Sequence, residues 1–386
     1  MKILIYTEYF YPIPGGVQTV VSDLAYGLSE WQTKQGTSES FDVTVVTRTG
    51  ERCPEDSTYP FKLVRRPSFW RLCQIIRGVD IVHIAGPALL PLAIAFLLRK
   101  PVAVEHHGFH AGCPNGLLFL EDEQAPCPGH FMARHYRRCL ACNRAAVGTF
   151  RSLYWLMMTP VRRWLSNRAG VNIMPTSWLG GVLALNRMTT IHHGVSNRAC
   201  CQDHRPGISL FAFQGRLVST KGAGLLIDAA RILRQKGLTA DLKFIGDGPE
   251  LPVLKSRGAE LGGHVEFTGH LASEGLDEIV CEAAAVVMPS LGGEVFGLVA
   301  AENMMRGKVL IVSDIGALHE VVGQAGLTFP TNDAAALADR MRQVLEDSEL
   351  SRSLGKAARE RALRLFDLDT MIEAHVSVYR APRAHM

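Results

Sequence analysis

The sequence predicts an α/β protein of two doubly wound domains, and three observations support this fold class. Its 386 residues are enough for two domains of ordinary size. Short apolar runs of strand length alternate with segments of helical period, which is the pattern of a parallel sheet flanked by helices. Glycine-rich loops follow several of these runs, at the strand ends where open α/β sheets bind ligands.

Composition indicates a globular protein, with 47% apolar and 20% charged residues. The N-terminal apolar run has strand length and is followed closely by Glu8, so we expect no secretory signal. The longest apolar run, residues 85–98, contains two prolines and is too short to cross a bilayer. A cytoplasmic protein is therefore expected.

The first domain is expected to contain five strands. They are predicted at residues 2–6, 41–47, 80–84, 101–105 and 171–174, with helices at 17–28, 150–166 and 177–185. Between the first strand and helix, Gly15 and Gly16 would let the backbone approach a ligand closely, although a plain turn is an alternative. The strand at 101–105 runs into a histidine-rich stretch, where His107 is well placed to hydrogen-bond a ligand; most isolated histidines are only polar surface residues.

The nine cysteines do not resemble a disulfide framework in a chain of this length. Five of them are expected to be unpaired thiols: Cys53, Cys73, Cys200, Cys201 and Cys281. The other four lie in a segment interrupted by proline and glycine: Cys113, Cys127, Cys139 and Cys142. Cys139 and Cys142 have a spacing that suits zinc, but the other two are widely spaced, so zinc and free thiols both remain open.

The second domain follows a short hinge at residues 189–195. Strands are predicted at 210–213, 241–245, 265–268, 284–288, 308–312 and 326–330, and a helix at 273–282. Three helices are expected to close the chain, at 332–346, 349–365 and 367–379. After the strand at 210–213, Arg216 and Lys221 could converge on a diphosphate, or both could be solvated cations.

The stretch from Gly292 to Glu302 predicts a strand, a glycine loop and a helix in succession. If the helix begins near Phe296, Glu302 lies about two turns into it while Glu294 stays in the loop. The amides of Phe296, Gly297 and Leu298 would then offer a helix N-terminus to a diphosphate. Two ordinary surface glutamates are the alternative.

Residues 292–302 resemble the E-x7-E signature of retaining glycosyltransferases of family 4, and residues 215–222 resemble that family's G-R-L-x-x-x-K-G donor motif. The resemblance implies a GT-B fold, in which two Rossmann-like domains face each other across an active-site cleft. Residues 1–195 would be the acceptor-binding domain, with a cysteine-containing insertion at about 110–145. Residues 196–365 would bind the nucleotide-sugar donor, and residues 366–386 would form a closing helical segment that crosses back to the first domain.

The resemblance also implies roles for particular residues. The catalytic set would be His107, Glu294, Arg216 and Lys221. The donor-binding set would be Gly15, Gly16, Gly246, Gly248, Phe296, Gly297, Leu298 and Glu302. Glu302 would bind the ribose hydroxyls and Glu294 the hydroxyls of the transferred sugar. Gly108 stands where many relatives carry Asp, so no role of that carboxylate carries over.

Catalysis is expected to need no metal and no cofactor besides the donor, a UDP- or GDP-sugar. The sole Asp-x-Asp triplet, residues 367–369, lies in the closing helical region, where it has no evident site. Fixed cations and helix N-termini are the other means of stabilising a departing diphosphate. A sugar-nucleotide epimerase of the same fold is an alternative function, as is a non-catalytic binding protein that retains the fold.

Positive charge is concentrated in one part of the chain. Residues 124–202 contain ten arginines and no acidic residue, and the rest of the chain carries 31 basic against 37 acidic residues. Residues 150–166 mix arginine with Leu, Met and Trp, as interfacial membrane segments do. We expect peripheral contact with an anionic membrane and a lipid-linked or polysaccharide acceptor, rather than nucleic acid; a solvated face or a groove for a soluble anionic acceptor are alternatives.

Overall fold

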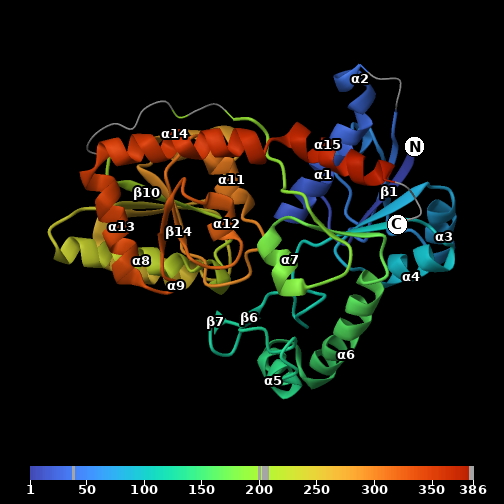
Figure 1. The fold of residues 1–386 in the computed structure, drawn as a ribbon. Coiled ribbons are helices and arrows are strands. Elements are labelled where there is room, and N and C mark those ends of the chain that lie inside the picture. The colour runs from blue at the N-terminus through green and yellow to red at the C-terminus, as the bar shows by residue number, and fades with distance from the viewer. Residues whose placement is uncertain (37–39, 199–200, 202–207, 382–386) are drawn as a thin grey trace. The chain divides into compact units, whose positions relative to one another are not determined.

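The computed structural model describes residues 1–36, 40–198, 201 and 208–381 (Figure 1). It divides the chain into two compact units. Unit 1 comprises residues 1–118, 128–194 and 368–386, and unit 2 comprises residues 119–127 and 195–367. The chain therefore enters unit 2 twice before its last helix completes unit 1.

Unit 1 is built on a seven-stranded parallel sheet in the order β3-β2-β1-β4-β5-β8-β9. Its strands are β1 (Lys2–Thr7), β2 (Asp42–Thr47), β3 (Lys62–Arg65), β4 (Ile81–Ala85), β5 (Val102–Glu105), β8 (Val171–Met174) and β9 (Met188–Thr190). The central strands β1, β4 and β5 are almost wholly buried, as expected for a parallel sheet covered on both faces.

Eight helices of unit 1 are described with this sheet, and several of them pack apolar residues against it. They are α1 (Gly16–Ser29), α2 (Trp31–Gln35), α3 (Phe69–Arg77), α4 (Leu89–Leu97), α5 (Tyr136–Val147), α6 (Thr149–Ser166), α7 (Ser177–Leu183) and α15 (Leu368–Arg380), with a 3-10 turn at Pro54–Ser57. Helices α3, α4 and α6 contribute Leu72, Leu92 and Leu165 to one core. Helix α15 packs against α1 so closely that a Cβ at Gly27 would lie 1.9 Å from Ile372.

Unit 2 contains a six-stranded parallel sheet in the order β12-β11-β10-β13-β14-β15. Its strands are β10 (Leu210–Gln214), β11 (Asp241–Ile245), β12 (Val265–Gly269), β13 (Ala285–Met288), β14 (Leu310–Ser313) and β15 (Leu327–Phe329). The short segment that joins this unit earlier in the chain forms an antiparallel pair, β6 (Phe119–Leu120) and β7 (Ala125–Pro126).

Two apolar cores cover the two faces of this second sheet. The helices are α8 (Ala223–Gln235), α9 (Leu251–Gly258), α10 (Ser273–Glu282), α11 (Leu298–Met305), α12 (Leu318–Val322), α13 (Ala334–Glu346) and α14 (Ser348–Leu365), with 3-10 turns at Ser219–Lys221 and Ala259–His264. Leu226 of α8 and Leu337 of α13 lie in one core. Ala300 of α11 and Ala358 of α14 lie in the other, so the sheet is doubly wound.

Most predicted elements are confirmed, and the exceptions have local causes. The strand Lys62–Arg65 escaped prediction because charged residues occupy both of its ends. The predicted hinge begins with an edge strand, β9, which pairs in parallel with β8. The predicted start of α11 near Phe296 is wrong, because the helix begins at Leu298 and Glu302 is only its fifth residue.

The expectation that Cys201 and Cys281 are unpaired thiols is wrong, because their sulfur atoms form a disulfide with a Cα–Cα distance of 5.0 Å. The two residues are 80 positions apart, and only the folding of unit 2 brings Cys201 beside the end of α10. Cys53 and Cys73 are free, and Cys200 lies outside the described residues.

None of the described helices combines the length and the apolar character needed to cross a lipid bilayer. The longest apolar run of the sequence instead supplies α4, whose residues Leu92, Ile94 and Ala95 are buried in unit 1.

Candidate functional site

The loops of unit 2 that carry Lys221 and Glu294 follow the neighbouring strands β10 and β13. These strands are parallel and adjacent, so the loops that follow them leave the same edge of the sheet. The loops are also joined directly, because the amide of Leu291 donates to the carbonyl of Thr220 at 2.8 Å. Gly222 lies so close to the second loop that an added Cβ would be 2.1 Å from the carbonyl oxygen of Pro289. The two predicted motifs are therefore held together by backbone contacts.

Lys221 and Glu294 form an ion pair between these two loops. The side chain of Glu294 is only 7% exposed, whereas that of Lys221 is 33% exposed. Glu294 Oε1 also accepts a hydrogen bond of 2.9 Å from Ser290 Oγ. Glu294 therefore has a fixed position, while Lys221 reaches it from partial contact with solvent. The family resemblance implied a role for each of these residues but not their pairing.

Glu302 lies in a second polar chain on α11, close to the end of β10. Its Oε2 accepts a hydrogen bond of 3.3 Å from Gln214 Nε2, and Gln214 Oε1 accepts one of 2.9 Å from Asn303. Burial raises the pKa of Glu302, although Arg306 opposes the shift. Gln214 and Asn303 were not predicted as site residues. The available signals were that Gln214 ends a strand and that Asn303 directly follows Glu302.

The beginning of α11 depends on a backbone conformation that favours glycine. Gly297 precedes the helix with φ 94°, and a Cβ there would lie 2.7 Å from the side chain of Leu318. The side chain of Phe296 is 1% exposed and packs edge-on against Phe366, so it is part of the core rather than of a ligand surface. Only the backbone of Phe296 can then serve a ligand.

Gly246 and Gly248 follow β11 and pack against the loop that carries Arg216. A Cβ at Gly246 would lie 2.0 Å from the carbonyl oxygen of Gly215, and one at Gly248 would lie 2.3 Å from that of Leu217. The close approach of the two loops thus requires both glycines. The Arg216 side chain extends from this rigid support and is exposed.

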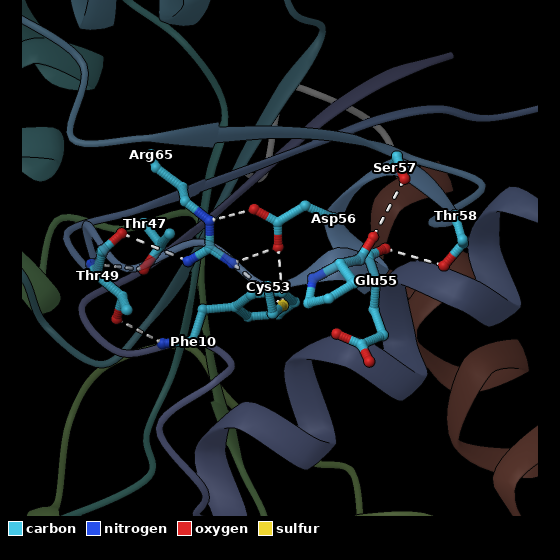
Figure 2. Close-up of polar contacts among 10 residues, drawn as sticks. Phe10, Thr47, Thr49, Cys53, Glu55, Asp56, Ser57, Thr58 and Arg65 are labelled. Carbon is cyan, nitrogen blue, oxygen red and sulfur yellow. Dashed lines mark hydrogen bonds and ion pairs between the residues drawn. The ribbon is translucent and has the colours of Figure 1, made fainter.

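The predicted glycine loop of unit 1 follows β1. Gly15 precedes α1 and Gly16 is its first residue. The loop is anchored at Phe10, whose amide donates to Thr49 Oγ1 at 2.9 Å. Figure 2 shows that Thr49 belongs to a network in which Arg65 donates to both carboxylate oxygens of Asp56, at 2.7 and 2.6 Å, and lowers the pKa of Asp56 to about 2.

His107 lies just beyond β5, as predicted, but it belongs to a buried cluster that the sequence analysis missed. The cluster centres on Glu105, which is fully buried at the end of β5. Four histidines face this carboxyl group: His83 at 3.1 Å, His193 at 3.4 Å, and both His107 and His375 at 3.6 Å. Burial lowers the pKa of His107 to about 3, so its ring is neutral at physiological pH.

The histidine cluster is assembled from positions far apart in the sequence. His83 and Glu105 lie on the paired strands β4 and β5, and His375 lies on α15. His193 follows β9 and stacks on His107 with ring centroids 5.2 Å apart. Burial acts to raise the pKa of Glu105, but the facing histidines outweigh this effect and hold the pKa well below its usual range. The signal in the sequence was one polar residue in each of two apolar strands, His83 in β4 and Glu105 in β5.

The four-cysteine segment contributes three buried thiols to unit 1. Cys113, Cys139 and Cys142 are buried, and Asn115 contacts both Cys113 and Cys142. Cys127 belongs to the segment assigned to unit 2. Both groups of metal-ligating side chains found among the described residues contain Glu105, and neither contains a cysteine.

Two parallel α/β domains with polar loops at the carboxyl ends of their strands define a GT-B protein, and solved structures confirm this fold. HepE from Anabaena, solved with UDP and glucose, superposes with a TM-score of 0.74 at 17% identity, over 99% of this chain and 100% of that chain. Sucrose-phosphate synthase from Thermosynechococcus elongatus gives a TM-score of 0.70 at 20% identity, with 98% of each chain covered.

Family models match nearly the whole chain in two parts. Residues 14–197 match the model described as Glycosyltransferase Family 4, and residues 203–361 match that described as Glycosyl transferases group 1. The chain belongs to glycosyltransferase family 4.

Curated relatives include a glycogen synthase and two mannosyltransferases. The chain is 32% identical to the glycogen synthase of Mycobacterium tuberculosis over 222 residues, covering 56% of this chain and 53% of the relative. It is 30% identical to O-antigen chain mannosyltransferase C of Escherichia coli over 178 residues, covering 45% and 47%. It is 31% identical to phosphatidyl-myo-inositol mannosyltransferase of Mycobacterium leprae over 161 residues, covering 41% and 42%. The matches span about half the length of these relatives.

Proposed function

We propose that this protein is a retaining glycosyltransferase of the hexosyltransferase type, which transfers a sugar from a UDP- or GDP-sugar to a lipid-linked or polysaccharide acceptor. The observation that carries the proposal is the ion pair between Lys221 and the buried Glu294, at the joined ends of β10 and β13. Family membership and the solved complexes of similar proteins with UDP support a nucleotide-sugar donor.

Lys221 and Arg216 would stabilise the departing diphosphate. Transfer breaks the bond between the anomeric carbon and the phosphate oxygen, so negative charge grows on that oxygen as the sugar becomes cationic. The exposed guanidinium of Arg216 can pair with two phosphate oxygens, and the ammonium of Lys221 acts as a point charge. Because Glu294 holds Lys221 in the free protein, the cation is in position before the donor binds.

Glu294 and Glu302 would position the two sugars of the donor. Glu294 is fixed by Lys221 and Ser290 and would accept hydrogen bonds from hydroxyl groups of the transferred sugar. Glu302, which is steadied by Gln214, would accept hydrogen bonds from the ribose. Sugar contacts matter most as the anomeric centre flattens, so Glu294 would act on turnover and Glu302 on donor affinity.

The proposed mechanism uses no metal ion at the diphosphate. Fixed cations and the amides that precede α11 supply the stabilisation that a metal provides in other transferases. Within unit 1, His107 would act as a neutral hydrogen-bonding group and the Gly15–Gly16 loop would bind a ligand through its backbone amides.

A donor screen tests this function. The protein is incubated with radiolabelled UDP-glucose, UDP-galactose, UDP-N-acetylglucosamine or GDP-mannose and with lipid or polysaccharide acceptors, without added Mg²⁺ or Mn²⁺. We expect label to enter an acceptor, with the donor's anomeric configuration kept when the linkage is examined by NMR, and we expect Glu294→Gln to slow transfer strongly. Epimerised donor without acceptor labelling would instead establish an epimerase, and binding without turnover would establish a non-catalytic protein.

We also propose that unit 1 contacts an anionic membrane at the cytoplasmic face through α6. The exposed large apolar residues of this helix recur every three or four positions and so form one stripe: Phe150, Leu153, Tyr154, Met157, Val161 and Trp164. Arg151 and Arg168 are exposed beside the stripe, and Arg168 lies over the ring of Trp164 at 3.5 Å. Apolar side chains bordered by arginine suit the headgroup region of an anionic bilayer.

Two arginines of α6 are excluded from this surface. Arg163 donates to the carbonyl oxygens of Leu183 and Ala184 at the end of α7, at 2.5 and 2.9 Å. Arg162 is partly buried. Substitution of either residue would disturb unit 1 itself, so the binding test uses the exposed positions.

Vesicle flotation tests the membrane contact. We expect the protein to float with vesicles that contain phosphatidylserine, less so at high salt, and not with vesicles of phosphatidylcholine alone. Phe150→Ser with Met157→Ser should lower binding to the anionic vesicles on the order of tenfold or more: complete burial of such a side chain contributes about 1.5–3 kcal/mol, and Phe150 and Met157 are 93% and 58% exposed. Leu97→Ser is the matched control, because Leu97 is 83% exposed but lies on α4. Equal binding to neutral vesicles, or no effect of the double variant, would contradict the proposal.

A further inference from the structure

The histidine cluster of unit 1 surrounds a carboxyl group that has no conventional counter-charge. Glu105 is fully buried, and its ion-pair partners among the described residues are all histidines, with no lysine or arginine. An ionised carboxyl group in an apolar interior is costly unless a cation balances it.

The tautomer of His375 identifies where a cation is needed. His375 Nδ1 lies 2.8 Å from the carbonyl oxygen of Met371, and a carbonyl can only accept, so Nδ1 carries the hydrogen. In the neutral ring Nε2 then carries a lone pair, and it faces Glu105 Oε2 at 3.6 Å with no hydrogen-bond partner. Two acceptors that face each other in a buried site repel, so either a proton or a metal ion must lie between them.

The spacing between His375 and Glu105 fits a metal ion better than a direct hydrogen bond. Charge-assisted hydrogen bonds of this kind are about 2.7–2.9 Å long. His83 Nε2 lies within hydrogen-bond distance of Glu105 Oε2, at 3.1 Å, whereas His375 Nε2 lies 3.6 Å from the same oxygen, too far for a hydrogen bond. Two ligand atoms that are each about 2.0–2.1 Å from a tetrahedral zinc ion lie about 3.3 Å apart. The ligand atoms of His83, Glu105 and His375 all fall within 4.8 Å of one another.

Contacts behind the two histidines resemble the outer shell of a metal site. His375 donates to a backbone carbonyl, and His83 Nδ1 lies 2.8 Å from the hydroxyl of Tyr379. Such partners fix the ring orientation and tautomer of metal-ligating histidines. The second oxygen of Glu105, Oε1, makes no hydrogen bond and faces His193 Nδ1 at 3.4 Å.

We propose that unit 1 binds one structural divalent cation of the zinc type through His83 Nε2, His375 Nε2 and the carboxylate of Glu105. Two imidazoles and a carboxylate form a donor set that zinc accepts. The ion joins β4, β5 and α15, and so fastens the last helix to the sheet of unit 1. The inference does not depend on the proposed glycosyl transfer, because its tests measure metal content and affinity.

Zinc titration of the purified full chain tests the site. The chain carries an affinity tag without histidine, is freed of metal, and is titrated with Zn²⁺ against a chromophoric chelator. We expect one tight site per chain. Tyr379→Phe, which keeps all three ligands, should weaken zinc binding about 10- to 100-fold, as loss of an outer-shell partner does. His375→Gln, which removes a ligand, should weaken it further.

Two control variants locate the ion. His192→Gln alters a histidine that bonds to the carbonyl oxygen of Pro175 outside the cluster, so zinc affinity should not change. Cys139→Ser with Cys142→Ser should also keep the site, and the Co²⁺-loaded protein should lack thiolate-to-cobalt charge-transfer absorption. Absence of a tight site would overturn the proposal, as would a site that survives Tyr379→Phe undiminished or disappears in the cysteine variant. Tyr379→Phe keeps the test decisive if His375→Gln fails to fold.

Discussion

Lys221→Met should separate the structural and the catalytic contributions of the ion pair with Glu294. A fully buried pair costs about 3–5 kcal/mol when one partner is removed, and an exposed pair about 0–1 kcal/mol. Glu294 is 7% exposed and Lys221 33% exposed, so we expect an intermediate loss of stability, about 1–2 kcal/mol. Turnover should fall on the order of 100-fold, as when other electrostatic stabilisers are lost.

A double variant makes the separation sharp. In Lys221→Met with Glu294→Gln the buried charge is gone, so urea unfolding should recover most of the lost stability. Initial rates with the donor identified by the screen should be no higher than in the single variant, because the cation at the diphosphate and the carboxylate at the sugar are then both missing. Lys243→Met is the matched control: its partner Glu266 is 60% exposed at 3.5 Å, so both stability and turnover should change little.

One result would refute this reasoning. If Lys221→Met lost stability but kept its turnover, the pair would be a structural link between two loops and the proposed role of Lys221 would be wrong. A double variant that regained turnover would lead to the same conclusion.

The remaining predictions concern the two glutamates and the disulfide. Steady-state kinetics should show that Glu294→Gln lowers kcat with little change in the donor KM, whereas Glu302→Ala mainly raises that KM; the reverse pattern would contradict the assigned roles. Glu302→Gln should stabilise the protein at neutral pH. Burial raises the pKa of Glu302 above 4.5, so the folded state binds the proton more tightly and wild-type stability falls as pH rises through 4.5 towards the folded-state pKa. Urea unfolding at acidic and neutral pH should show the gain only at the higher pH, and an equal gain at both would exclude this cause. Cys281→Ser should cost about 4.5 kcal/mol of unfolding free energy, the chain-entropy value for an 80-residue loop, while Cys73→Ser should cost far less.

The sequence predicted the strands of both sheets well because parallel strands covered on both faces are continuous apolar runs. Residues 171–174 and 241–245 were predicted to the residue. The start of α11 was misplaced because Gly297 adopts a positive φ that delays the helix by two residues. Sequence pattern identifies where a glycine loop is, but not which residue of it turns the chain.

Pairings between distant residues could not be predicted from spacing. Lys221 and Glu294 are 73 positions apart, and His83 and Tyr379 are 296 apart. Each pair is brought together by the sheet order and by the return of α15 to unit 1, which depend on the packing of the whole unit. The disulfide was missed for the same reason.

The return of α15 to unit 1 has a consequence for folding during synthesis. Residues 195–367, which form most of unit 2, must be made between the last strand of unit 1 and α15. At about 5–20 residues per second, this delay is roughly 10–35 s. Throughout it, the surface of α1 around Gly27 lacks Ile372, and His83 lacks its tyrosine partner. A ribosome that stalls within unit 2 would therefore leave the first-made domain incomplete, with apolar surface accessible to chaperones.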